Sequence, residues 1–353
     1  MVKAPQFGLN RFDWTSTDAF VADVQRAEQL GFGYALIPWN PLSRPDPYLQ
    51  LAVAAGYTEH IRLGLLLDNP VLRHPAASAS SIATLDEVSG GRAILTYGIG
   101  DTAVRWLGLR PARLAELETA TVLARRLLAG EAVDVGAVRP ARLRHARPVP
   151  VWIAAGGPRT LEMAGRVADG VFLRVGRHPE NLRVAIGRVH RGARAAGRDP
   201  DDIGIGLIFH TVMSDRPDAI RAISRSMAAG YYEYSPALFE IPGLTWAGPP
   251  VDALKKQIYP DFHHASDLVE SGKLVSFLDD EAADAFALFG SAEEIARRVR
   301  EAIDLVGRVD IVVPHPVPTP APGASVPRTL PQELTGADYK TWFAREVMPL
   351  IVG

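Results

Sequence analysis

The chain has 353 residues and a net charge of −2, and 47% of its residues are hydrophobic while 22% are charged. This ordinary globular composition assures a sizeable core, and no basic face or run indicates nucleic acid or a membrane surface as a partner. The chain has no cysteine, which excludes disulfides, thiol nucleophiles and thiolate metal sites and fits a cytoplasmic protein. Neither a signal peptide nor an apolar run of about 18 residues, as a membrane span needs, is found.

Short apolar segments alternate with amphipathic segments along most of the chain. The predicted strands span residues 7–9, 34–38, 63–67, 93–99, 148–155, 170–175, 203–213 and 309–313. The predicted helices span residues 17–30, 47–55, 75–89, 114–128, 160–167, 179–196, 217–229 and 291–305. Eight such units close a parallel sheet into a barrel, whereas a doubly wound sheet would prefer a glycine fingerprint after its first strand. We therefore expect an α/β fold, a (β/α)8 TIM barrel formed by one domain over residues 1–353.

Two segments do not fit the repeat. Residues 231–284 form an insertion before the last helix, where an ordered loop can cap the mouth of a barrel. Residues 314–353 form a C-terminal extension, which begins with a proline-rich strap at 314–331 that leaves little room for helix or sheet. An amphipathic helix at 337–350 follows the strap, and we expect it to pack on the barrel or on a partner.

Polar and turn residues follow two neighbouring buried strands in the stretch 62–101, around which the candidate site is built. Asp68 and Asn69 follow the first strand, and Gly98, Gly100 and Asp101 follow the second. The carboxyl ends of parallel strands are where ligands bind, so Asn69 can offer its amide to a heterocycle and Asp101 can accept a hydrogen bond. The alternative for Asp101 is that it caps the following turn.

The same stretch contains a candidate anion site at Arg73 and His74. A histidine directly before a proline is, however, also typical of a simple helix start.

A glycine turn joins the fifth strand to the next helix. It consists of Ala155, Gly156, Gly157, Pro158, Arg159 and Thr160. Glycine lets a ligand approach the backbone, and the helix start offers free N–H groups and the positive end of the helix dipole. This is the best phosphate site in the chain; the alternative is a plain turn that needs glycine for its backbone angles.

Aromatic and histidine side chains supply candidates for the substrate side. Trp39 can stack on a flat ring or be a core residue, Asn40 follows it, and His210 lies toward the end of the seventh strand as a base or a satisfied core residue. His263 and His264 are adjacent, and neighbours on a helix point about 100° apart, so both cannot hold one ion. We expect no metal, and instead a contact of the insertion with substrate. The absence of GxSxG and of a Walker loop disfavours a serine hydrolase and a nucleotide kinase.

Three segments in order carry a resemblance to a known family. Residues 68–101 contain DNPVLRHP, ATLDEVSGGRA and GIGD, residues 148–173 contain AAGGPRT, and residues 286–313 form the closing segment. Together they resemble the bacterial luciferase-like superfamily, and most of all its coenzyme F420-dependent oxidoreductase branch, which includes methylenetetrahydromethanopterin reductase. The likeness covers roughly residues 5–315.

The resemblance implies a barrel that holds a flavin or deazaflavin at the carboxyl ends of its strands. The cofactor phosphate would lie on Gly156, Gly157, Arg159 and Thr160. The ring would be backed by a non-prolyl cis peptide near Leu66 and Leu67, bordered by Asp68 and Asn69, and flanked by residues 98–101. The implied reaction is hydride transfer between coenzyme F420 and a small organic substrate.

The resemblance leaves the proton donor unassigned. Some members place an acid–base pair after the second strand, where this chain has Trp39 and Asn40, neither of which titrates. The substrate-side candidates are Trp39, Asn40 and His210, together with Tyr232, Tyr234, His263 and His264 in the insertion.

Two other functions stay open at this point. The first is an FMN-dependent monooxygenase that uses reduced flavin and oxygen, with a flavin reductase as its partner. The second is a non-catalytic flavin-binding barrel. In each case we expect a homodimer, as is common for barrels of this superfamily.

Overall fold

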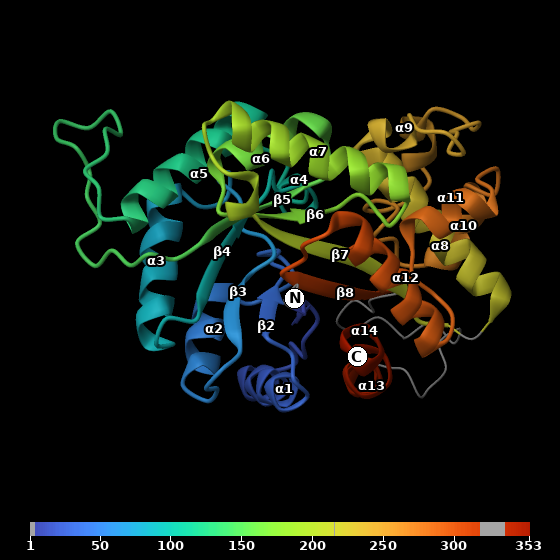
Figure 1. Cartoon of the computed structure of the whole chain (residues 1–353), viewed down its shortest axis with the longest axis horizontal. Helices are drawn as coiled ribbons and strands as arrows, with labels where there is room; N and C mark the ends of the chain where they lie inside the picture. Colours follow the sequence, from blue (N-terminus) through green and yellow to red (C-terminus); the bar gives the residue numbers. More distant parts are fainter. Residues whose placement is uncertain (1–3, 215, 318–335) are drawn as a thin grey trace.

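Eight parallel strands close into a barrel in the order of the sequence, and helices cover its outer surface (Figure 1). This computed structural model describes residues 4–214, 216–317 and 336–353. The strands are β1 (Gln6–Leu9), β2 (Tyr34–Ile37), β3 (Arg62–Leu65), β4 (Ala93–Tyr97), β5 (Val151–Ala155), β6 (Gly170–Leu173), β7 (Gly204–Val212) and β8 (Ile311–Val317). The (β/α)8 barrel predicted from the sequence is thus confirmed.

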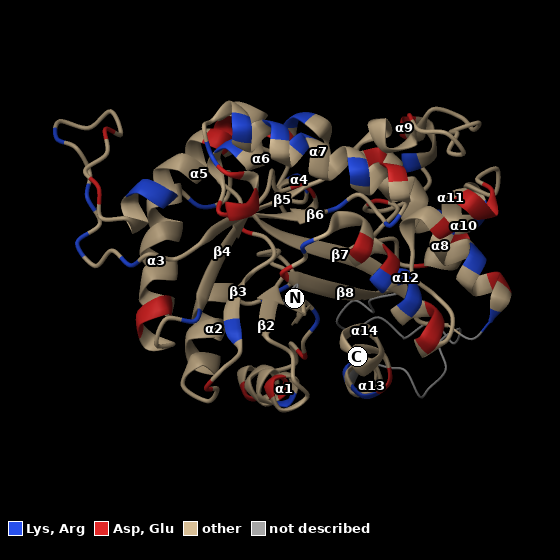
Figure 2. Ribbon diagram, in the orientation of Figure 1, with Lys and Arg blue, Asp and Glu red and all other residues tan. Residues whose placement is uncertain are grey.

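The main helices of the repeat match the predicted positions closely. They are α1 (Thr17–Gln29), α2 (Pro47–Ala55), α3 (Pro75–Val88), α5 (Leu114–Leu128), α6 (Pro158–Val167), α7 (Pro179–Ala195), α8 (Pro217–Tyr234) and α12 (Ala292–Val306). The shorter helices are α4 (Thr102–Arg105), α9 (Val251–Lys255), α10 (Leu268–Leu274), α11 (Asp280–Phe286), α13 (Gly336–Trp342) and α14 (Met348–Val352). Figure 2 shows both signs of charge interspersed along outer helices such as α8 and α12. In the described part of the chain, no helix combines the length and apolarity that crossing a membrane requires.

Large side chains fill the barrel interior opposite glycines. The indole of Trp152 lies where a Cβ atom on Gly170 or Gly204 would overlap it, and the ring of Phe172 is placed in the same way against Gly206. These rings belong to one buried cluster, which also contains Leu36, Ile94, Ile208, Ile311 and Val313. The interior is therefore a packed core, and open space is confined to the ends of the barrel.

The last strand is longer than predicted. The structure corrects the expectation that residues 314–317 belong to a strap without sheet, because β8 pairs with β7 as far as Val317. Pro314 and Pro316 are tolerated because β8 pairs with β1 only at Ile311 and Val312, so beyond that point it is paired on one side. The rest of the expected strap, 318–331, lies outside the described residues.

The helix before the insertion is also longer than predicted. It was expected to end at residue 229, but α8 continues to Tyr234 and ends before Pro236, which restricts Ser235 before it. Gly230 does not break α8, and a Cβ atom there would overlap the ring of His263. The first residues of the expected insertion therefore lie on a barrel helix, and α9, α10 and α11 make up much of the remainder.

The C-terminal helical segment packs back on the barrel, as one of the two expected alternatives. Its α-helical ends, α13 and α14, flank a π-helical turn at Phe343–Val347. Phe343 is buried edge-on against Phe7 of β1, at 6.1 Å between ring centroids, and Lys340 pairs with Asp23 of α1.

A matched pair of glycines in α7 tests how tightly the outer helices pack. A Cβ atom at Gly192 would overlap the carbonyl group of Glu162 in α6, whereas one at Gly187 would meet no atom within 4 Å. We predict that Gly192→Ala lowers the free energy of unfolding by about 1–3 kcal/mol or more. Gly187→Ala should raise it by up to ~1 kcal/mol, since alanine favours helix. Urea unfolding measures both, and equal effects of the two substitutions would contradict the packing described.

Candidate functional site

Two adjoining cavities open at the carboxyl ends of the strands, each of about 160 Å³. The central cavity lies over the barrel axis, and the helix cavity lies beside the start of α6. Six residues line both cavities, namely Leu67, Gly100, Asp101, Ala154, Arg174 and Tyr234. The two cavities are therefore adjacent across a shared wall, and together they are called the crevice.

The segment after β3 forms part of this wall. The peptide bond between Leu66 and Leu67 is cis, at the position that the family resemblance implied, and both side chains line the central cavity. Gly98 lies behind this wall rather than in it, and a Cβ atom at Gly98 would overlap the side chain of Leu67. Gly98 thus gives Leu67 the room to take its place.

Asp68 supports the wall from beneath. It was expected to border a ring, but its side chain is fully buried and lines neither cavity. It accepts hydrogen bonds from the Tyr48 hydroxyl at 2.6 Å, the Ser78 hydroxyl at 2.7 Å and the Asn69 amide at 2.8 Å. Burial raises the pKa of Asp68 above its ordinary value, although these three bonds oppose the shift.

Asn69 presents its amide to the central cavity. Its Oδ1 accepts hydrogen bonds from the backbone of Val71 and Leu72, at 3.2 and 2.9 Å, which orients the side chain. Its Nδ2 has no acceptor among the described residues, so a donor is left for a ligand. Gly100 packs against Asn69 in a left-handed conformation, with φ of +73°, where a Cβ atom would lie 2.6 Å from Asn69 Cγ.

Asp101 lies on the shared wall and pairs with Arg105 one turn further along the chain. Asp101 occupies the N-cap position of α4, as the alternative expected, but its side chain makes no capping bond there. Arg73 and His74, the second candidate anion site, are otherwise engaged. Arg73 pairs with Asp46 at 2.5 Å, and His74 caps α3 by accepting the Ala76 amide, as expected of a helix start.

The start of α6 forms one side of the helix cavity. Ala155, Gly156, Gly157 and Thr160 line the cavity, whereas Pro158 and Arg159 do not, and Arg159 is exposed. A Cβ atom at Gly156 would lie 2.5 Å from the carbonyl oxygen of Arg174, so this turn needs glycine for close packing. At Gly157 a Cβ atom would meet nothing nearer than 3.8 Å, so the absent side chain leaves open space beside the helix start.

Arg174 was missed in the sequence. It follows β6 directly, lines both cavities, and forms no ion pair with any described carboxylate. Its guanidinium carbon lies 5.5 Å from the centre of the Tyr234 ring. The strand was expected to run to residue 175, which hid Arg174 among core residues. An unpaired cation beside the free N–H groups of a helix start is suited to an anion.

Trp39 and Asn40 separate in the structure. Trp39 lines the central cavity, and its indole nitrogen is buried with no hydrogen-bond partner among the described residues. Asn40 does not line the cavity; its Oδ1 accepts the amide of Leu42 and stabilises the turn after β2.

Three histidine rings pack together beneath the central cavity, which His210 and His315 line. The His210 ring centroid lies 4.6 Å from that of His263 and 5.1 Å from that of His315. His315 also lies 2.7 Å from the amide of Asn10. Burial lowers the pKa of His210 and His315 well below the ordinary value, and that of His263 to about 3. All three are therefore neutral. His315 was missed because its proline neighbours indicated an irregular strap.

The residues predicted in the insertion take different positions. Tyr234, at the end of α8, lines both cavities, and burial raises its pKa well above the ordinary value. Tyr232 instead stacks on Trp246 at 4.1 Å and lines neither cavity. His264 lines the central cavity beside Asp261, whereas His263 is buried and lines neither cavity.

Comparison with known proteins gives one family and several relatives. The model of the luciferase-like monooxygenase family matches residues 7–308. A 5,10-methylenetetrahydromethanopterin reductase of Methanolobus tindarius is 32% identical over 303 residues, which cover 82% of this chain and 88% of the relative. An F420-dependent hydroxymycolic acid dehydrogenase of Mycobacterium tuberculosis is 33% identical over 58% of this chain and 62% of its own length.

Solved structures agree with the fold. The coenzyme F420-dependent tetrahydromethanopterin reductase of Methanopyrus kandleri superposes with a TM-score of 0.68 at 23% identity, covering 98% of this chain and 99% of that chain. At 23% identity, this match supports a shared barrel fold.

The buried carboxylate of Asp68 makes a pH-dependent prediction. In the folded protein the pKa of Asp68 is raised above its ordinary value of 3.8. The free energy of unfolding therefore falls as the pH rises from the unfolded-state pKa to the folded-state pKa, because the ionised carboxylate is disfavoured in the buried site. Tyr48→Phe removes one donor to that ionised form. We expect it to lower the free energy of unfolding by about 1–3 kcal/mol at neutral pH and by less in acid, where Asp68 is protonated.

Urea unfolding at neutral and acidic pH checks this difference. Tyr57→Phe is the matched control, since Tyr57 is an exposed tyrosine. An effect of Tyr48→Phe that does not depend on pH would show that Asp68 is not ionised in the folded protein.

Proposed function

The chain belongs to the luciferase-like monooxygenase family, and from that premise we propose that it is an oxidoreductase that transfers hydride between coenzyme F420 and a small organic substrate. One observation carries the proposal. A crevice at the strand ends is walled by the cis-linked Leu66 and Leu67 and runs to an unpaired Arg174 beside the start of α6. An apolar wall that ends in an anion site suits a flat ring with an acidic tail. Relatives named as F420-dependent support this choice of cofactor.

The residues present fit such a cofactor. We propose that Leu66 and Leu67 contact the ring, and that the Nδ2 donor of Asn69 binds its polar edge beside Gly100 and Asp101. The open space at Gly157 and the free N–H groups of Gly157, Arg159 and Thr160 would bind the phosphate, with Arg174 supplying the countercharge.

When bound, a deazaflavin gives or accepts hydride at one ring carbon, and the protein supplies orientation and exclusion of water. Trp39, His210 and Tyr234 line the central cavity and are the proposed substrate-side contacts, together with His264. We propose that three further residues stabilise the segments that form this surface, because each has its own partner away from the cavity. These residues are Asn40, Tyr232 and His263.

The proposal includes the setting of the enzyme. We propose a homodimer that acts on a small molecule in the cytoplasm. A flavin reductase would be needed as a partner only if the cofactor were reduced FMN.

A cofactor titration tests the proposed function. We expect saturable quenching of F420 fluorescence by the wild-type protein and no comparable binding of reduced FMN. Gly157→Val should weaken F420 binding at least ~tenfold by filling the open space, a loss of about 1.4 kcal/mol. Gly157→Ala, whose Cβ atom meets nothing closer than 3.8 Å, is the matched control and should bind normally.

Two other results of the titration would replace the proposed function. Exclusive binding of reduced FMN would replace the proposal with the monooxygenase. Tight F420 binding without turnover of any alcohol, carbonyl or imine substrate would favour the non-catalytic barrel.

Arg174 is tested against a second cation nearby. Arg174→Gln should weaken F420 binding roughly 10–100-fold, as expected for the loss of a charge-assisted hydrogen bond worth about 1.5–3 kcal/mol. Arg159→Gln should have a smaller effect that added salt abolishes, since Arg159 is exposed. A larger loss at Arg159 would move the phosphate site out of the crevice.

A further inference from the structure

We infer that His264, oriented by Asp261, is the acid–base group of this enzyme, and that its substrate couple is therefore an alcohol and the corresponding carbonyl. This inference rests on the proposed function and deepens it, because it assigns the proton transfer that accompanies hydride transfer. It stands on the geometry of three residues that come from two distant parts of the chain, Thr102 after β4 and Asp261 with His264 in the insertion.

Asp261 is held in one orientation by four donors. Its Oδ1 accepts the backbone amides of His263 and His264, at 2.9 and 3.0 Å, and lies 2.8 Å from Nδ1 of His264. Its Oδ2 accepts the hydroxyl of Thr102 at 3.1 Å. A carboxylate only accepts hydrogen bonds, so Nδ1 of His264 carries the shared proton.

The charge of Asp261 is stable within this arrangement. Burial alone would raise its pKa, but the neighbouring His264 and the hydrogen bond from that ring lower the pKa of Asp261 below the ordinary value. The carboxylate is therefore ionised at neutral pH, where it stabilises an imidazolium at His264. An orienting carboxylate behind an imidazole is the arrangement that proton-transferring histidines commonly use.

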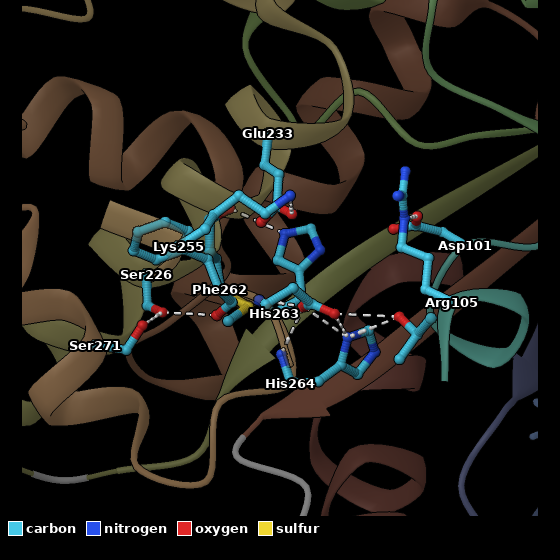
Figure 3. Close-up of polar contacts among 12 residues, drawn as sticks. Asp101, Arg105, Ser226, Glu233, Lys255, Phe262, His263, His264 and Ser271 are labelled. Carbon is cyan, nitrogen blue, oxygen red and sulfur yellow. Dashed lines mark hydrogen bonds and ion pairs between the residues drawn. The ribbon is translucent and has the colours of Figure 1, made fainter. Parts of the chain in front are cut away.

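Only one nitrogen of the neighbouring histidines is available for proton exchange in the cavity. His264 has a half-exposed side chain that lines the central cavity, and with Nδ1 held by Asp261 its Nε2 has no partner among the described residues. His263 is buried, and its Nε2 lies 3.0 Å from the carbonyl oxygen of Met227. In Figure 3 the two rings point in different directions.

The other titratable groups of the cavity are less suited to this role. His210 is buried and His315 is partly buried, and neither has a carboxylate partner among the described residues, so a positive charge on either would be costly. Asp101 is paired with Arg105, and burial keeps the hydroxyl of Tyr234 protonated. His264 alone among the described residues of the lining combines an oriented imidazole with an exposed edge through which the proton can leave to solvent.

The presence of an acid–base group constrains the substrate. Oxidation of an alcohol breaks a C–H bond and an O–H bond while a C=O bond forms; the hydride takes both electrons to the oxidised deazaflavin, and the proton passes to Nε2 of His264. Reduction of the carbonyl reverses both transfers. Reduction of a positively charged imine needs hydride alone, so a residue that only delivers protons would have no part in it.

The first experiment measures access to His264 without turnover. The wild-type protein is treated with diethyl pyrocarbonate, and modification of each histidine is measured by mass spectrometry with and without saturating F420. We expect His264 to react and to be protected by F420. His60, whose side chain is 85% exposed and lies outside the cavities, should react equally in both samples. Unchanged reactivity of His264 would overturn the inference.

The second experiment measures the proton transfer. A panel of small alcohols and carbonyls, starting with propan-2-ol and acetone, is assayed with F420 and reduced F420. We expect turnover of at least one couple, and a fall in kcat of about 100-fold or more in His264→Gln. F420 affinity should be unchanged, and added imidazole should restore turnover in His264→Ala. His60→Ala is the matched control and should resemble wild type.

Asp261→Asn separates the positioning residue from the acid–base group. It should lower kcat without changing KM or F420 affinity, and imidazole should not rescue it because the His264 side chain still fills the place. The inference fails if His264→Gln keeps the wild-type kcat, or if wild type reduces imines but no carbonyl. A wild-type protein that does not bind F420 at all overturns the proposed function itself.

Discussion

Closure of the barrel is the constraint on which the candidate site depends. Because the strands are parallel and run in sequence order, residues that follow β2, β3, β4, β5, β6 and β7 meet at one rim although they come from the whole length of the chain. The interior below this rim is filled by rings such as Trp152 and Phe172, which leave no room for a ligand inside the barrel. The crevice is therefore the open top of a packed core.

Much of this arrangement could be predicted from the sequence, because it depends on local pattern. Alternating apolar and amphipathic segments predicted the barrel, and the glycine turn before α6 predicted one side of the helix cavity. The cis bond between Leu66 and Leu67 came from the family resemblance, since no property of two leucines indicates it.

The parts that sequence reasoning missed depend on tertiary partners. The sequence pattern places Arg174 at the end of a strand, and only the fold shows that no described carboxylate pairs with it. His315 lies between two prolines, which normally disfavour a strand. Asp68 follows its strand as a ligand-binding residue would, yet the hydroxyls of Tyr48 and Ser78 bind it beneath the wall. A pattern locates such residues at the rim, but which way each side chain turns depends on partners far away in the chain.

The bond between Thr102 and Asp261 joins segments 159 residues apart and has a thermodynamic consequence. Thr102 is the first residue of α4 and directly follows Asp101, which lines both cavities, whereas Asp261 belongs to the insertion beside the central cavity. A ligand that shifts the Asp101 loop therefore changes the free energy of docking the insertion, and by reciprocity the docked insertion changes that ligand's affinity by an equal factor. Occupation of one end of the crevice is thus coupled to the position of the insertion beside the other end.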